Sequence, residues 1–190
     1  KKIQHLVFAA IMILCACVSV RTEILPVKAF TSADGLGSSF VNYITTDSKG
    51  FLWVCTRDGL SRFDGSRFIN YQLDAPDAAP GIENLFELKN GKYIIGSTGG
   101  MFVYDPAIPS TGNPDRPTLK AELLSKNRGH IIEDRNGVIW FSSTGLYNVI
   151  FTDGKATLVQ VKLDLPRNAT RGFAIVAAAE GADGSLWLNT

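Results

Sequence analysis

Histidine and cysteine are scarce in this chain of 190 residues, which has two histidines and three cysteines. Two of the cysteines, Cys15 and Cys17, lie near the N-terminus, so the sequence offers no disulfide framework. Neither sign of charge dominates, because 19 basic residues nearly balance 18 acidic ones. That balance argues against a nucleic-acid partner. The 45% hydrophobic content excludes a disordered tail.

Long apolar runs are absent except for Leu6 to Val20, which follows the basic start Lys1-Lys2. This run is shorter than the ~20 residues that span a bilayer. Its proportions are typical of a secretory signal. We expect residues 1–21 to be a signal peptide or membrane anchor, through cleavage near Ala16 or Ser19, lipidation of Cys17, or retention as an anchor. Each alternative places the remaining chain outside the cytoplasm.

A repeat runs through the rest of the chain. A glycine, any residue, an apolar position and then an aromatic position follow one another four times, starting at Gly50, Gly91, Gly137 and Gly184. These glycines stand 41, 46 and 47 residues apart, which is the length of one four-stranded propeller blade. Three of the copies carry Trp53, Trp140 and Trp187, whereas the second has Ile94. A small hydroxyl residue follows three positions later, as in Thr56 and Ser97.

Each unit is predicted to be a meander of short strands joined by tight turns. In the first unit the strands are expected at 41–46, 51–56, 60–63 and 67–72, and in the third at 131–133, 138–142, 146–151 and 157–161. Asp64-Gly65 and Asp153-Gly154 are strong hairpin signals. No strand pattern explains the Pro-rich insertion 106–117.

The pattern predicts an all-β fold, a partial β-propeller of about three and a half four-stranded antiparallel blades arranged as an open arc. The incomplete propeller is expected over 27–190, with units near 30–75, 80–120, 126–165 and 170–190. Each tryptophan should lie in mid-strand, where one blade packs on the next. The chain ends within a predicted strand, so we expect it to be the front part of a longer polypeptide with poor solubility by itself.

The first unit closely resembles the two-component regulator propeller repeat. The residues that carry the resemblance are Phe30 to Leu36 and Asp47 to Gly65, and Asp134 to Trp140 looks like another copy. The resemblance implies the extracytoplasmic sensor region of a bacterial hybrid sensor kinase or diguanylate cyclase, on the periplasmic side of the inner membrane. It further implies a saccharide or other nutrient as ligand, with the kinase or cyclase in domains that these residues do not include.

Catalytic motifs do not rise above background, so no catalytic residue, metal or cofactor is expected in this segment. Cys55 is predicted to be a small core residue.

Propeller ligand sites lie at a channel mouth, on the loops that enter the innermost strands and those that join the second and third strands. The candidate ligand-binding residues on these loops are Ser38, Arg57, Asp58, Thr98, Arg128, His130, Thr144 and Arg171. The three arginines suit an anionic ligand, unless they are ordinary solvated loop charges.

The partners expected for this region are a small-molecule or oligosaccharide ligand, the remaining blades and output domains of the same chain, and the inner membrane. A homodimer is left open. Two other functions are left open as well. A secreted propeller lyase or glycosidase would need paired carboxylates, or a His/Tyr/Arg group, at one mouth, and Arg128 with His130 is the one hint of it. A non-catalytic interaction scaffold would need no such group.

Overall fold

The computed structural model describes residue 5 and residues 27–75, 77–163 and 177–189. Most of the expected signal or anchor segment, including Cys17, lies outside these ranges, and so do Arg171 and Thr190. Among the described residues, no helix has the length and apolar character needed to cross a membrane.

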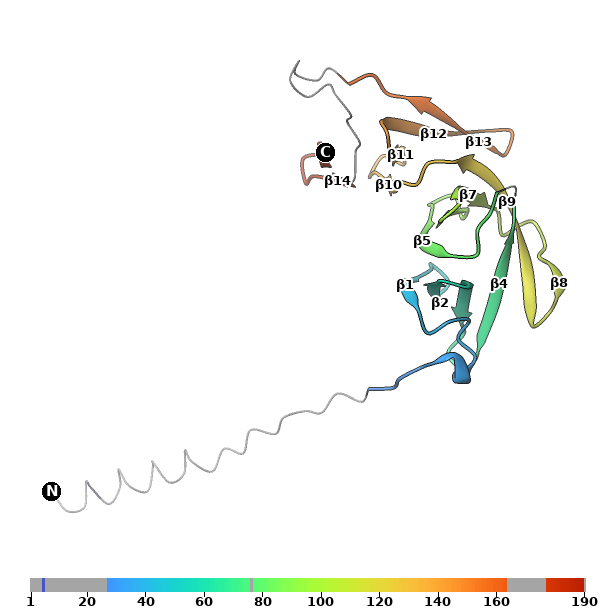
Figure 1. The fold of residues 1–190 in the computed structure, drawn as a ribbon. Helices are drawn as coiled ribbons and strands as arrows, with labels where there is room; N and C mark the ends of the chain where they lie inside the picture. Colours follow the sequence, from blue (N-terminus) through green and yellow to red (C-terminus); the bar gives the residue numbers. More distant parts are fainter. Residues whose placement is uncertain (1–4, 6–26, 76, 164–176, 190) are drawn as a thin grey trace.

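Short strands are nearly the only regular secondary structure of the described residues, which confirms the all-β prediction, and they follow one another along a curved path (Figure 1). A 3-10 turn, η1 (Ser32–Asp34), precedes the strands. The first unit contains β1 (Val41–Thr46), β2 (Leu52–Thr56), β3 (Gly59–Phe63) and β4 (Phe68–Asp74). The second contains β5 (Ile82–Glu87), β6 (Tyr93–Ser97), β7 (Gly100–Tyr104), β8 (Thr111–Asn113) and β9 (Arg116–Ser125). The third contains β10 (His130–Glu133), β11 (Ile139–Ser142), β12 (Leu146–Thr152) and β13 (Lys155–Gln160), and the fourth β14 (Ala177–Glu180) and β15 (Leu186–Asn189).

Successive strands of the first and third units pair antiparallel, as the meander prediction required. The predicted strands of both units begin and end within two residues of the observed ones. The partial propeller is therefore confirmed as the fold of the described residues.

The insertion between β7 and β9 departs from the prediction, because its residues form strands. β8 and the first part of β9 make a hairpin, and β9 then runs parallel to β4 of the first unit, pairing Gln72 with Thr118 and Leu73 with Leu119. The second part of β9 pairs antiparallel with β7. One strand thus joins the outer edges of two units into a nine-stranded sheet. Parallel pairing between distant segments leaves no local sequence signal.

Two hydrophobic clusters lie between neighbouring units. The first joins Trp53 and Cys55 of the first unit to Leu85 and Tyr93 of the second, and it also includes Leu119 from β9. The second joins Ile94 and Met101 of the second unit to Ile139 and Phe141 of the third. The face-to-face packing of units therefore supplies the core, as expected for propeller blades.

The turn between the first two strands has the same geometry in all four units. Its fourth residue is a glycine with φ between 81° and 86°, at Gly50, Gly91, Gly137 and Gly184. The N–H of this glycine donates to the carbonyl oxygen of the first turn residue. The N–H of that first residue donates to the carbonyl oxygen four positions after it, just beyond the turn. A side chain would be strained at this φ, which explains the regular glycine.

The three tryptophans occupy the second strand of their units but differ in burial. Trp53 is 5% exposed, Trp140 is half-buried and Trp187 is 69% exposed. The expectation that each tryptophan is packed against a following unit fails for Trp187, because no described residues cover that face. Thr56 and Ser97 are fully buried at the ends of their strands. Thr56 Oγ1 donates to the carbonyl oxygen of Gly59 at 2.8 Å, as expected for the hydroxyl positions.

Candidate functional site

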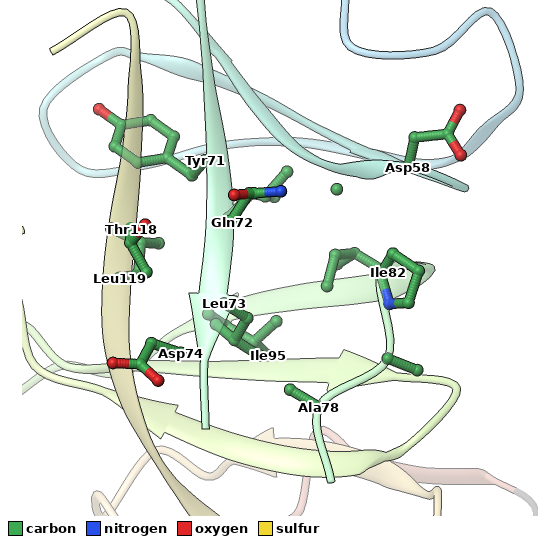
Figure 2. A pocket seen from close by; sticks show the side chains of 14 residues that line it. Asp58, Tyr71, Gln72, Leu73, Asp74, Ala78, Ile82, Ile95, Thr118 and Leu119 are labelled. Atoms are coloured by element: carbon green, nitrogen blue, oxygen red, sulfur yellow. The ribbon is translucent and has the colours of Figure 1, made fainter. Parts of the chain in front are cut away.

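A hollow of about 320 Å³ lies between the outer strand of the first unit and the loop that leads into the second (Figure 2). β4 and β9 form one wall, with Tyr71, Gln72 and Asp74 from β4 and Thr118 from β9. Asp58, on the turn between β2 and β3, borders it as well. Figure 2 shows Asp58 and Asp74 at opposite ends of the residues that line the hollow, with Gln72 between them. The volume falls at the lower end of the range for small-molecule sites.

The local sequence explains why this wall is rigid. Tyr71 is almost fully buried, and its ring lies 5.5 Å from that of Trp53. Burial raises the pKa of the Tyr71 hydroxyl, while the positive charge of Arg62 opposes the shift. Gly59 has a φ of 140°, and a Cβ there would lie 2.9 Å from the carbonyl oxygen of Tyr71. The glycine therefore permits the close approach of β3 to β4 behind the hollow.

The polar groups around the hollow are neutral or negatively charged. The described residues that line it include two aspartates, a glutamine and a threonine but no lysine, arginine or histidine. Apolar surface comes from Leu73 and Ile82, among others. Such a lining suits a neutral or positively charged ligand with several hydroxyl or amine donors and one apolar face.

A second hollow, of about 300 Å³, lies against the same β3–β4 region. It shares Asp58 and Tyr71 with the first hollow and is closed by the segment before β1, which includes Leu36, and by Arg116 at the start of β9. Tyr71 and Asp58 of the first unit therefore border two hollows that residues of the second unit complete.

The loops predicted to form the ligand-binding mouth lie side by side within each of the first three units. The N–H of Arg57 donates to the carbonyl oxygen of Phe40 at 3.1 Å, and the N–H of Thr98 donates to that of Gly81 at 3.0 Å. In the third unit, Ser143 Oγ donates to the carbonyl oxygen of Arg128 at 2.6 Å. Each bond joins the turn after the second strand to the loop before the first.

Two of the three predicted arginines, Arg57 and Arg128, contact protein groups of their own. Arg128 Nη1 donates to Glu83 of the second unit at 2.6 Å, so this guanidinium forms an ion pair between units. The Arg57 guanidinium lies 5.9 Å from the centre of the Phe40 ring. Arg171 lies outside the described residues. The structure thus leaves the anionic ligand as a prediction and does not gather these arginines at one described cavity.

The other predicted residues are spread over the same loops. Ser38 is half-buried and accepts the N–H of Phe40, while Thr98, His130 and Thr144 are exposed. Asp58 is the predicted residue that borders both hollows. Among the described residues, no group of three His, Cys, Asp or Glu side chains could hold a metal ion.

Sequence reasoning missed Gln72, Asp74 and Thr118. These residues meet because β4 and β9, more than 40 positions apart, pair in parallel. The signal that could have drawn attention to them was the unexplained insertion itself, since a long unpatterned connection in a compact domain is often functional.

Comparison with known proteins places this geometry in context. Residues 35–58 match the sequence model of the family described as two component regulator propeller. Over 51 residues, or 27% of this chain, the sequence is 49% identical to histidine kinase P4 of Formosa agariphila, and the chain spans 4% of that protein.

Solved structures show the same fold. The extracellular domain of a hybrid two-component system of B. thetaiotaomicron aligns with a TM-score of 0.60 and 22% identity, over 85% of this chain and 23% of that one. The extracellular domain of a one-component system of the same organism also reaches 0.60, at 20% identity, over 86% and 24% of the two chains. Virginiamycin B lyase of Staphylococcus aureus aligns with a TM-score of 0.52 and 17% identity, over 76% of this chain and 47% of the lyase. The described residues thus form a partial β-propeller, and residues 35–58 match the two component regulator propeller model.

Proposed function

We propose that this chain is the ligand-sensing propeller region of a bacterial two-component-type signal transduction protein, on the periplasmic side of the inner membrane. The observation that carries the proposal is the match of residues 35–58 to the two-component regulator propeller family. The matched residues contain β1, β2 and the turn between them, including Asp47 and Trp53. The matched motif is therefore part of the framework that holds the units together.

In this proposal the segment itself binds and does not catalyse. A histidine kinase or diguanylate cyclase output belongs to other domains of the protein, since this chain spans 4% of the histidine kinase it matches. The expected division into a signal or anchor segment at 1–21 and an incomplete propeller at 27–190 is part of the same proposal.

The ligand that we propose is a neutral or amine-bearing saccharide in the hollow beside Tyr71. Gln72, Asp58, Asp74 and Thr118 offer hydrogen-bonding groups for sugar hydroxyls, and Leu73 offers an apolar surface for a ring face. Two carboxylates with no lining cation disfavour an acidic saccharide there.

Titration calorimetry of the intact chain tests this assignment, with cellobiose, maltose, glucosamine and digalacturonic acid as probes. We expect heat from a neutral or amine-bearing probe, a weakening of about tenfold or more in Gln72→Ala, and no change in the control Gln160→Ala, on the exposed side of β13. Binding of digalacturonic acid that survives Gln72→Ala would instead place the site at the arginines. Release of shortened products from the probes would favour a propeller lyase or glycosidase.

A further inference from the structure

A glutamate joins each of the second, third and fourth units to the unit before it. Glu87 lies directly before the turn of the second unit, and its carboxylate accepts the N–H of Ser48 at 2.6 Å and its hydroxyl at 2.7 Å. Glu133, directly before the turn of the third unit, accepts the N–H of Lys89 at 2.7 Å. Three units of the chain thus repeat one contact, because Glu180 of the fourth unit accepts the N–H of Arg135 at 2.9 Å.

The donor in each contact is the N–H that the turn itself does not use. In the first unit, the N–H groups of Asp47 and Gly50 bond to turn carbonyls, and those of Lys49 and Phe51 donate to Asp47 Oδ1. The N–H of Ser48, at the second turn position, points out to the next unit and meets Glu87. A carboxylate on a backbone N–H is a charge-assisted bond, which is stronger and more directional than a neutral one.

The fourth unit presents the same donor with no carboxylate from the described residues. Gly181 and Gly184 N–H groups bond within the turn, and that of Ser185 donates to Asp183. Ala182 holds the second turn position, and no described residue accepts its N–H. Beside it lies Trp187, which pairs with Ala179 as Trp53 pairs with Thr45 and therefore faces the same way.

We propose that this face of the fourth unit, with Ala182 and Trp187, docks a further repeat of the same kind that carries a glutamate directly before its turn. The same interface occurs three times between successive units of the chain, and each time the following unit supplies the glutamate. The exposed indole provides the apolar surface, and the Ala182 N–H provides the polar contact that sets the register.

A second copy of this chain fits the face less well. The position equivalent to Glu87 in the first unit is Thr46, which carries no negative charge. The outward face of the first unit is also partly covered by its own leading segment, where Gly37 N–H donates to Ser61 Oγ at 3.1 Å and Asn70 Nδ2 donates to the carbonyl oxygen of Gly35 at 2.9 Å. The docking face therefore selects a glutamate-bearing repeat over the first unit of another copy.

The test is a tandem chain in which a second copy of residues 144–190 follows Thr190 directly. This fusion keeps the register, because Thr190 stands three residues after Trp187 as Ser143 does after Trp140. It is compared with the same fusion carrying Glu180→Ala in the appended copy alone. Hydrogen exchange of the Ala182 amide is read by NMR, with the Ser48 amide, which is bonded to Glu87, as the folded control.

We expect exchange of the Ala182 amide to slow by about tenfold or more in the glutamate fusion, and to return to the unfused rate in the Glu180→Ala fusion, with Ser48 equally protected in both. Equal protection in both fusions would overturn the role of the carboxylate. No protection in either fusion, with Ser48 protected, would overturn docking on this face. Protection of Ala182 in the unfused chain that rises with protein concentration would show that a second copy occupies the face, and would overturn the proposed occupant.

Discussion

The indole Nε1 of Trp53 donates a hydrogen bond to Oδ2 of Asp47 at 2.8 Å, across the turn that separates the first two strands of its unit. Trp140 makes the same bond to Asp134 at 3.0 Å. In the second unit both partners are replaced together, by Leu88 and Ile94, and both of those side chains are buried. In the first three units the carboxylate and the indole are therefore kept or replaced together, since a buried polar group without a partner is costly, whereas the exposed Trp187 of the fourth unit has Gly181 at the aspartate position.

Removal of the Asp47 carboxylate should destabilise the chain strongly. This group also accepts the N–H groups of Lys49 and Phe51 and the hydroxyl of Tyr93. Asp47→Ala leaves the three N–H donors unsatisfied, while the Tyr93 hydroxyl keeps Glu87 as an acceptor. We expect the free energy of unfolding in urea to fall by about 2–3 kcal/mol. Asp183→Ala, at the third position of the exposed turn of the fourth unit, is the control without an indole bond and should cost less than about 1 kcal/mol. Equal losses in the two variants would show that the indole bond adds nothing.

The turn aspartates should make the chain less stable in acid. Burial alone would raise the pKa of Asp47, but the bonds from Trp53, Phe51 and Lys49 outweigh it and hold the pKa below 3.8. The N–H groups of Arg67 and Ser66 lower the pKa of Asp64 to about 2. A lowered folded-state pKa stabilises the fold above the unfolded-state pKa, and this stabilisation is lost as the pH falls through the folded-state value.

Urea unfolding between pH 6 and pH 2 checks this expectation. The free energy of unfolding should be level near neutral pH and should decline below a pH of about 4. The free energy of unfolding of the Asp47→Asn variant should be lower at pH 6 and should decline less steeply as the pH falls. An acid-insensitive native chain would contradict the bonding described for these turns.

The Cys55 thiol should be inert in the folded chain. It is fully buried in the cluster between the first two units, and burial raises its pKa to about 12. A chain with Cys15→Ser and Cys17→Ser isolates this thiol. We expect no reaction with a disulfide reagent at pH 8 until denaturant is added, because the thiolate is the reactive form. Rapid reaction of the native protein would place Cys55 outside the core.

The β9 crossover should stabilise the first two units jointly. Leu119 belongs to the second unit by sequence, yet it is 1% exposed in the cluster around Trp53. Leu119→Ala should lower the free energy of unfolding by about 2–5 kcal/mol. Ile108→Ala, in the same insertion but 43% exposed, serves as the control and should change it little. A small effect of Leu119→Ala would mean that the parallel pairing of β4 and β9 does not hold the units together.

The sequence predicts the units well because their determinants are local. Asp64-Gly65 and the glycine of each first turn fix the hairpins within a few residues. The β9 crossover and the hollow beside Tyr71 depend on pairing between Gln72 and Thr118, for which no neighbouring residues provide a signal. The exposure of Trp187 depends on what lies beside its unit, which a repeat motif does not encode.

The packing of successive units through their tryptophan-bearing strands is the claim on which the remaining account depends. Fluorine NMR of the intact chain labelled with 5-fluorotryptophan measures it directly, through the shift of each resonance between H₂O and D₂O, with single Trp→Phe variants for assignment. Trp53 should show no solvent shift, Trp140 an intermediate one and Trp187 the largest. Three tryptophans with the same solvent shift would contradict the stacked arrangement of the units.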